Sequence, residues 1–405
     1  MIEINRKLLK WIRRNSGVAA SLPIPAASRS FVRRAVKRLR ISVHSRYTTK
    51  ALAGRAANLD DVATFMANHA VPLRAPLVLI SQVQRSGGTL LSQLFDAHTA
   101  LAAYPQELRL GFPNSNVWPK IDPACSADEN FRMMYDPNLA RLVSRGYKKG
   151  EANPERKPFL IMPQVQYRLF KHLFDETPPT SRRMILDYFF TAFFNGWLNY
   201  QGDLAQKRWI TAFAPRLAVD ESNVKAFFEC YPDGRLIQIV RDPRTWYASL
   251  KNHTKTGAIR QDPPRAISKW IRSAKSMQRN KRQYGQRVIV LSFEELVGQT
   301  DATLRAIARE LAVEYDQALL EPTFNGQTMK ANSSFPVEQV GLIAAPLERA
   351  GLLSADEQQL IEREGRSLYD SLAKQTLLAK AAVQSPAHEP HARGQIVDAI
   401  PSTTQ

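Results

Sequence analysis

A short polar turn between an apolar run and a helical pattern holds the residues best suited to binding an anion. Leu77–Val83 is rich in Val, Leu and Ile and has the length of a buried parallel strand. The polar stretch Gln84–Thr89 follows it, and apolar residues at helical spacing begin at Leu90. A turn between a strand and the start of a helix aims several backbone N–H groups at one point, with the positive end of the helix dipole behind them. The pattern therefore predicts an anion site at this turn, although a purely structural turn would have the same residues.

The residues of this turn suit an anion in three ways. Gly87 and Gly88 permit unusual backbone angles, Ser86 and Thr89 supply hydroxyl donors, and Arg85 supplies a fixed positive charge. A loop that binds a nucleoside triphosphate also needs a lysine, which reaches the terminal phosphates. No lysine lies between Lys50 and Lys120. The turn is therefore predicted to hold an anion, but not the β- and γ-phosphates of ATP.

A second anion-seeking segment follows another apolar run. Leu236–Val240 is predicted as a buried strand, and it leads into Arg241-Asp242-Pro243-Arg244. Arg241 stands eight positions before Ser249 and is a candidate phosphate clamp, although a single arginine is more often a salt-bridge residue. Ligands collect at the carboxyl ends of parallel strands, which is where both polar segments begin. Two such segments at one edge predict a ligand with phosphates at both ends.

The remaining elements alternate in the manner of an α/β protein. Strands are predicted at Leu77–Val83, Leu236–Val240 and Val288–Leu291. Helices are predicted at Asp60–Ala70, Ser181–Tyr200, Val219–Tyr231, Pro263–Tyr284, Ala302–Leu311 and Gln358–Leu372, the last opened by the capping box Ser354–Glu357. The region 111–180 shows little periodicity, so loops and short helices are expected there. This alternation predicts a P-loop-like three-layer α/β fold with a central parallel sheet flanked by helices.

Charge divides the chain into an extension and a body. The net charge is +19, yet residues 1–59 hold 14 Lys or Arg and a single acid, which leaves only +6 for the other 346 residues. The body is therefore not expected to bind nucleic acid. The extension has a basic amphipathic pattern. Such a pattern is typical of helices that lie on anionic membrane surfaces, of solvated arms and of targeting segments. We expect residues 60–384 to form the main domain and residues 385–405 to be a disordered tail.

Two cysteines, Cys125 and Cys230, provide no disulfide framework, which favours a reducing compartment. The expected location is the cytoplasm, peripheral to a membrane if the extension binds one.

The two phosphate motifs resemble those of sulfotransferases that use 3′-phosphoadenosine-5′-phosphosulfate (PAPS). Gln-Arg-Ser-Gly-Gly-Thr-Leu-Leu, followed by Phe-Asp-Ala-His, is similar to the 5′-phosphosulfate loop of that family. Ile-Val-Arg-Asp-Pro-Arg-Thr-Trp-Tyr-Ala-Ser is similar to its 3′-phosphate segment, with Arg241 and Ser249 as the paired residues. The resemblance covers Leu77–Phe335. It implies that Arg85–Leu90 holds the phosphosulfate, that PAPS is the co-substrate and that no metal is needed.

The resemblance also implies an acid–base pair. In the tyrosylprotein branch, a Glu-x-Arg follows the Asp-Ala-His helix, and Glu107-Leu108-Arg109 occupies a similar place here. Glu107 would then accept the proton of the acceptor hydroxyl, and Arg109 would orient it. An ordinary surface ion pair is the alternative, and His98 is a rival base that is better suited to packing.

Two further parts of the family's pattern concern the leaving group and the adenine end of the donor. Many relatives have Lys-Thr-Pro where this chain has Phe213-Ala214-Pro215, so Lys207, Arg208 or Arg216 would have to replace the missing lysine. Near the adenine end, the resemblance assigns Lys330 and Asn332 to the 3′-phosphate, although a plain loop fits the sequence equally well.

Three functions are compatible with these observations. The first is a PAPS-dependent sulfotransferase acting on a hydroxyl of a glycan or glycolipid. The second is a P-loop-type nucleotide kinase, against which the missing lysine argues. The third is a membrane-binding protein with a degenerate enzyme body, a reading that would rest on the basic extension.

Overall fold

The computed structural model describes residues 59–111, 117–136, 139, 142, 146–147, 156–253, 259, 261–331 and 350–384. The predictions made for residues 1–58, for Asn332 and for the tail 385–405 fall outside these ranges. In the first half of the chain the elements are α3 (Leu59–Asn68), β1 (Leu77–Ile80), α4 (Gly88–Phe95), β2 (Leu101–Glu107), α5 (Ala127–Met134), α7 (Pro163–Glu176), α8 (Arg182–Asn195) and β3 (Trp209–Phe213). The second half adds α9 (Glu221–Cys230), β4 (Arg235–Val240), α10 (Pro243–Lys251), α11 (Pro263–Tyr284), β5 (Val288–Ser292), α12 (Phe293–Gly298), α13 (Thr300–Glu310), β6 (Thr323–Phe324), β7 (Gln327–Thr328), α14 (Ala355–Ala373) and α15 (Leu377–Gln384).

A parallel sheet of five strands, in the order β2-β3-β1-β4-β5, lies at the centre of the described part of the chain. The α/β prediction is confirmed, and so are the predicted strands at β1, β4 and β5. Each of these strands is almost wholly buried, as expected for a parallel sheet covered on both faces.

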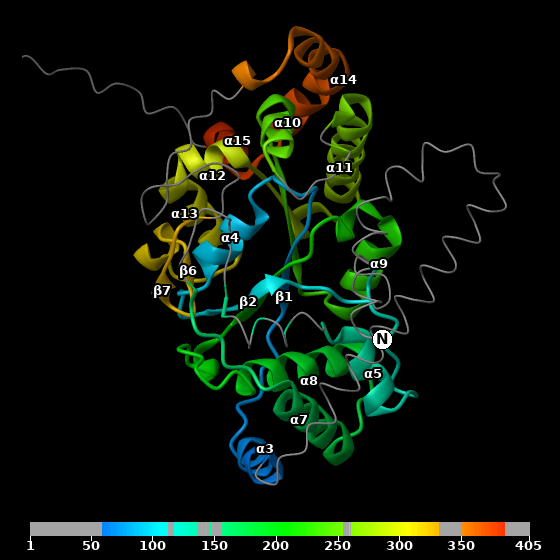
Figure 1. The fold of residues 1–405 in the computed structure, drawn as a ribbon, viewed down its shortest axis with the longest axis vertical. Coiled ribbons are helices and arrows are strands. Elements are labelled where there is room, and N and C mark those ends of the chain that lie inside the picture. The colour runs from blue at the N-terminus through cyan, green and yellow to red at the C-terminus, as the bar shows by residue number, and fades with distance from the viewer. Residues whose placement is uncertain are drawn as a thin grey trace, which may run out of the picture.

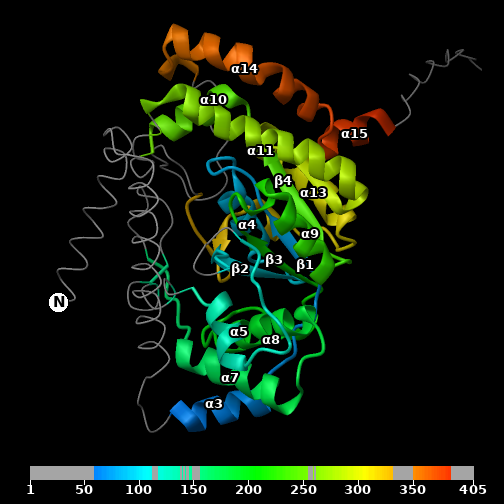
Figure 2. The ribbon, with the colours of Figure 1, turned by 90° about the vertical axis from the view of Figure 1, so that its right-hand side faces the viewer.

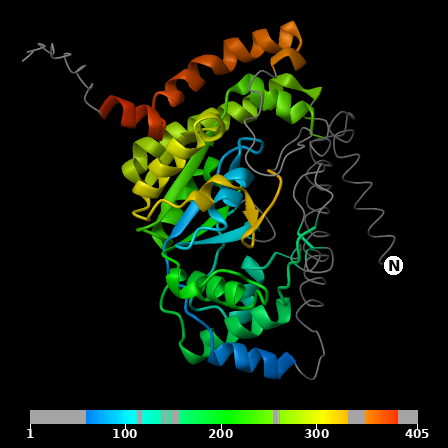
Figure 3. The ribbon, with the colours of Figure 1, turned by 90° about the vertical axis from the view of Figure 1, so that its left-hand side faces the viewer.

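Alternate side chains of the sheet enter two different cores. Leu77 and Leu79 of β1 pack in the core that includes the phenylalanines of α8 and α9. Val78 and Ile80 pack in the core that includes the apolar residues of α4, α12 and α13. Figure 2 shows α9 and α11 in front of the sheet, and Figure 3 shows α4 with the yellow helices α12 and α13 in front of the opposite face. The result is a three-layer α/β fold.

Two strands of the central sheet and one helix of the region 111–180 differ from the sequence-based prediction. We did not predict β2 and β3, because β2 contains alanines and a proline and β3 is only five residues long. Neither has a continuous β-branched run, so both depend on pairing with their neighbours. The region 111–180 was predicted to hold only short helices, but α7 has 14 residues. Its buried Val165, Leu169 and Phe170 lie on one helical face, which packs in the α8 core.

The glycine that opens α4 is required by packing. A Cβ atom on Gly88 would lie 2.3 Å from Cε2 of Phe213 and 2.4 Å from Nε2 of Gln82. Both neighbours are buried at the carboxyl end of the sheet, so neither side chain has room to withdraw.

We therefore expect Gly88→Ala to lower the free energy of unfolding by about 1–3 kcal/mol, as overpacking typically does. Gly298→Ala, at the end of α12, is the matched control, because a Cβ there meets nothing within 4 Å. Urea denaturation of both variants measures the difference. Equal midpoints would contradict the packing argument.

Candidate active site

Segments that follow four strands meet at the carboxyl edge of the sheet. Arg241, which follows β4, reaches the turn after β1 and donates from Nη1 to the carbonyl oxygen of Arg85 at 2.8 Å. After β3, the N–H of Arg216 donates to the carbonyl oxygen of Gln82 at 2.9 Å. After β2, the N–H of Leu108 donates to the carbonyl of Phe213 at 2.7 Å. The sequence-predicted residues of β1, β2 and β4 are thus brought to one edge.

The turn between β1 and α4 (residues 84–89) has two left-handed residues. Arg85 has φ 73° and Gly87 has φ 93°. Left-handed backbone suits glycine, whereas in an arginine it costs about 1–2 kcal/mol. Contacts from α10 and from the residue after β4 hold the turn in this conformation, because Trp246 Nε1 donates to the carbonyl oxygen of Gln84 at 2.8 Å and Arg241 donates to that of Arg85. The turn therefore comes preformed, with its N–H groups at the start of α4.

Arg241 is buried at the centre of these contacts. Its Nε donates to Thr245 Oγ1 at 3.1 Å, and its guanidinium lies 4.0 Å from the ring centroid of Phe293. The indole N–H of Trp270 donates to its carbonyl oxygen at 3.0 Å. A buried guanidinium that is fixed from several sides is a preorganised positive charge.

Arg85 and Ser249 are neighbours. The Nε atom of Arg85 lies 3.4 Å from Oγ of Ser249, which is 2% exposed and belongs to α10. Burial lowers the pKa of Arg85 to about 10, so the side chain still carries its charge at neutral pH. The structure thus unites the four residues on which the sequence argument rests, Arg85, Ser86, Arg241 and Ser249, at one place.

Two polar side chains beside the turn are buried without a hydrogen bond. Ser86 and Gln82 are each 1% exposed, and neither the hydroxyl of Ser86 nor the amide of Gln82 has a hydrogen-bond partner in the described part of the chain. Leaving such groups unpaired costs about 1–3 kcal/mol each, which a ligand that pairs them would recover. The sequence argument missed Gln82, since nothing in the sequence distinguishes it from a residue of the strand.

Glu107 and Arg109 lie at the end of β2 and form an ion pair. Arg109 Nη2 is 3.2 Å from Glu107 Oε2, and 31% of the Glu107 side chain is exposed. Arg109 Nε is also 4.0 Å from Asp136. Glu107 pairs in register with Phe213, the last residue of β3, so it faces the same edge as the turn. A half-exposed carboxylate held by an arginine is accessible to a substrate.

Arg216 is the one of the three replacement candidates that reaches this edge. Partial burial lowers the pKa of the Arg216 guanidinium, and the carboxylate of Glu107 partly offsets that effect. Lys207 and Arg208 precede β3 and therefore lie at the opposite edge of the sheet. Lys207 Nζ donates to the carbonyl oxygen of His98 at 3.1 Å. The structure thus excludes Lys207 and Arg208 from the site.

His98 is a structural residue, as its sequence position suggested. Its Nδ1 accepts from the N–H of Ala100 at 3.1 Å, which leaves the proton on Nε2 to donate to the carbonyl oxygen of Glu314 at 2.9 Å. Both ring nitrogens are used within the fold, at the amino edge of the sheet.

Lys330 follows the hairpin β6–β7. The preceding Met329 packs against α4, with its sulfur 3.1 Å from Gln93 Nε2. Asp96 fixes the hairpin, because its Oδ2 accepts from Gly326 N and from Thr323 Oγ1, each at 2.9 Å. A ligand role for Lys330 stays a prediction.

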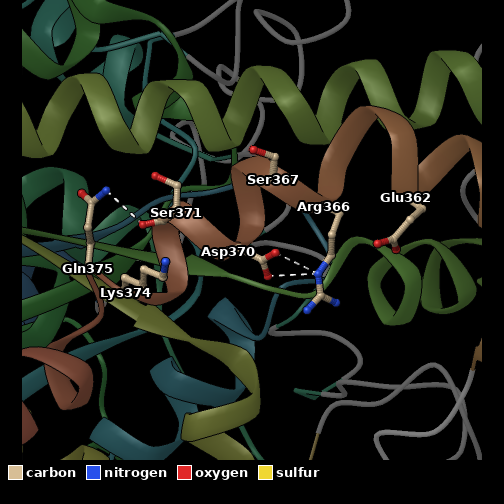
Figure 4. A pocket seen from close by; sticks show the side chains of 7 residues that line it. All are labelled: Glu362, Arg366, Ser367, Asp370, Ser371, Lys374 and Gln375. Carbon is tan, nitrogen blue, oxygen red and sulfur yellow. Dashed lines mark hydrogen bonds and ion pairs between the residues drawn. The ribbon is translucent and has the colours of Figure 1, made fainter.

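A shallow polar depression of about 760 Å³ lies along α14. Its lining residues are Glu362, Arg366, Ser367, Asp370, Ser371, Lys374 and Gln375, from α14 and the two residues that follow it. Figure 4 shows that Arg366 and Asp370 pair with each other there, at 3.0 Å. One helix face with internally matched charges is not a substrate site, and we assign it no function.

The described residues contain no group of three or more His, Cys, Asp or Glu that could hold a metal ion. Across the same residues, no helix combines the length and apolar character that a membrane span requires.

Comparison with known proteins identifies the class. The model of the sulfotransferase family matches residues 76–317, which is more than half of the chain. The protein therefore belongs to the sulfotransferase family. No curated protein sequence matches it.

Solved structures of similar proteins include the sulfotransferase domain of the olefin synthase from Synechococcus PCC 7002, with 20% identity and a TM-score of 0.42, over 74% of this chain and 95% of that one. Sulfotransferase STF9 from Mycobacterium avium is another, with 16% identity and a TM-score of 0.35, over 67% of this chain and 72% of that one.

Proposed function

We propose that this protein transfers a sulfuryl group from PAPS to a hydroxyl of a glycan or glycolipid. The observation that carries the proposal is the contact between the two anion-binding segments, in which Arg241 donates to the carbonyl oxygen of Arg85. The donor carries a phosphosulfate on the 5′ carbon and a phosphate on the 3′ carbon of one ribose. Its two anionic groups therefore need two cationic segments that lie a single nucleoside apart.

The residues of the turn fit the 5′ end of this donor. Gly87 and Gly88 form the turn at the start of α4, where the backbone N–H groups converge. The unpaired hydroxyl of Ser86 and amide of Gln82 supply buried hydrogen-bond partners. On the other side, Arg241 and Ser249 would hold the 3′-phosphate. Lys330 and Asn332 remain proposed contacts of the same phosphate.

When bound, the donor supplies a sulfuryl group activated by a phosphate leaving group. The acceptor oxygen forms a bond to sulfur on the face opposite the breaking S–O bond, as in phosphoryl transfer. Arg85 and the α4 N–H groups stabilise the negative charge that develops on the leaving phosphate. Glu107 accepts the proton of the acceptor hydroxyl, while Arg109 and Arg216 position the acceptor and Glu107. This scheme uses no metal ion.

The alternatives draw less support from the site. A nucleotide kinase would need a lysine that reaches the terminal phosphates of ATP, and residues 84–89 contain none. The membrane-binding alternative, and any anionic membrane surface as a partner, would rest on residues 1–58, which lie outside the described part of the chain.

Isothermal titration calorimetry tests the donor. We expect adenosine 3′,5′-bisphosphate to bind more tightly than ATP, because Arg241 and Ser249 are available only to a 3′-phosphate. Arg85→Ala and Arg241→Ala should each weaken this binding by about 1.5–3 kcal/mol, or roughly 10- to 100-fold. A preference for ATP would contradict the proposal.

The general base can be tested separately from donor binding. Glu107→Gln keeps the shape of the side chain but removes its capacity to accept a proton. We expect turnover to fall by about 10²-fold or more, with the affinity for adenosine 3′,5′-bisphosphate unchanged. If turnover stayed at the wild-type level, Glu107 would not be the base.

The support of the turn by α10 can be tested with a matched pair of tryptophans. Trp246 donates from its indole N–H to Gln84 in the turn, and Trp209 donates in the same way to the carbonyl oxygen of Leu311, each at 2.8 Å. Both rings are buried, and only the first touches the site. Trp246→Phe and Trp209→Phe should therefore lower the unfolding free energy by similar amounts.

Only Trp246→Phe should weaken adenosine 3′,5′-bisphosphate binding, by about 1 kcal/mol or roughly fivefold. Thermal melts and calorimetry on the two variants provide the comparison. Equal nucleotide affinities would show that the bond from Trp246 does not hold the turn.

A further inference from the structure

Helix α11 carries an unbalanced charge. Its 22 residues include seven Lys or Arg and no Asp or Glu. One face of the helix is apolar and buried, with Ile267, Trp270 and Met277 in the core shared with α10 and α14. The basic residues occupy the remaining surface, so the charge is concentrated on the side that the fold leaves open.

Five of these residues form a continuous row, which we call the α11 stripe: Arg265, Lys269, Arg272, Lys275 and Arg282. All five are exposed. At 3.6 residues per turn they fall within an arc of about 140°, and at 1.5 Å per residue they span about 25 Å. No hydrogen bond or ion pair joins any of these five side chains to another residue in the described ranges. Arg279 lies in the same arc but is engaged by Glu221, at 3.9 Å, and by the carbonyl of Val219, at 3.2 Å.

The stripe is unfavourable for the isolated protein. Like charges three and four positions apart on a helix repel one another. Burial lowers the pKa of Lys269, and the positive charges of Arg265, Arg216 and Arg272 lower it further. The described residues supply little that offsets this repulsion near Lys269, where only Asp262, the N-cap of α11, opposes it. A negatively charged ligand would remove the cost.

The stripe leads to the candidate active site. Arg216 is close enough to influence both Lys269 on α11 and Glu107 at the end of β2. The bond from Arg279 to Val219 also fixes α11 against the segment that follows Arg216. Figure 2 shows α11 crossing the same face of the sheet as α9. A chain whose hydroxyl lies at Glu107 can therefore continue past Arg216 onto the stripe.

We propose that the α11 stripe binds the acceptor, and that the acceptor is a polyanionic glycan with carboxylate or sulfate groups at regular intervals. This inference rests on the proposed function, because it takes Glu107 as the reacting end. A linear row of charges along one helix matches a linear polyanion. A membrane would be matched by a broad basic surface instead. Binding of duplex nucleic acid would not explain why the stripe leads to Glu107, a carboxylate placed to accept the proton of a hydroxyl.

The test measures binding of a fluorescent hyaluronan oligosaccharide, which has a carboxylate on every second sugar, by fluorescence anisotropy with the full-length protein and no donor. The stripe variant combines Lys269→Gln, Arg272→Gln and Lys275→Gln. We expect it to bind hyaluronan at least tenfold more weakly than wild type. Its dependence of log K on log salt should also be shallower by about two to three units, as expected when about three ionic contacts are lost.

The control variant neutralises three exposed basic residues elsewhere, Lys171→Gln on α7 and Arg305→Gln and Arg309→Gln on α13. These positions lie away from α11, so hyaluronan binding should stay within twofold of wild type. Equal losses in the two triple variants would overturn the proposal, because binding would then follow net charge alone.

Two further probes decide the class of partner. If the stripe variant lost as much affinity for phosphatidylserine vesicles or for duplex DNA as for hyaluronan, the assignment to a glycan would be wrong. Calorimetry with adenosine 3′,5′-bisphosphate on the same variant should give the wild-type affinity. That measurement separates the two proposals. If the donor assignment were wrong, adenosine 3′,5′-bisphosphate would bind neither protein tightly, while the difference in hyaluronan binding would remain.

Discussion

The hydrogen bond from Arg241 to the carbonyl oxygen of Arg85 is the interaction on which the site depends. It joins the ends of two adjacent parallel strands, β1 and β4, whose register is set by the sheet. It also holds Arg85 in a left-handed conformation that an arginine would not adopt without support. Through this one contact, the charge proposed for the 3′-phosphate shapes the turn proposed for the 5′-phosphosulfate. The two segments proposed to hold the ends of the donor are therefore mechanically coupled.

Aromatic rings packed against the two glycines also hold the turn in its conformation. Gly87 lies against Phe293, and Gly88 lies against Phe213 and Gln82, with no space for a Cβ atom in either case. Phe293 also covers the guanidinium of Arg241. Because the ring of Phe293 packs against both Gly87 and Arg241, the start of α4 and the segment after β4 share one support. Preorganised N–H groups and charges of this kind stabilise a transition state without reorganisation.

The sequence predicted those parts of the fold that have a strong local signal. The strands β1, β4 and β5 are rich in Val, Ile and Leu, and the long helix α11 opens with two prolines and ends at a glycine. The strands β2 and β3 could not be predicted in this way, because Ala-Ala-Tyr-Pro and five residues ending in Ala-Phe become strands only when neighbours pair with them. The turn and Arg241 were predicted together, because each follows an apolar strand and the carboxyl ends of parallel strands lie at one edge of a sheet.

Other residues of the site could be recognised only from the three-dimensional structure. Gln82 is one residue among many near a strand end until its amide is seen to be buried and unpaired. Arg216 could be separated from Lys207 and Arg208 only once the direction of β3 placed them at opposite edges of the sheet. The α11 stripe is visible in the sequence as a basic helix, but its link to Glu107 through Arg216 is a tertiary relation.

A crystal structure of the protein with adenosine 3′,5′-bisphosphate would test the central claim most directly. The account predicts the 5′-phosphate at the start of α4, hydrogen-bonded to the hydroxyl of Ser86 and to the backbone N–H groups that follow it, and the 3′-phosphate on Arg241 and Ser249. A nucleotide bound with its phosphates exchanged between these two positions, or bound away from the carboxyl edge of the sheet, would contradict it.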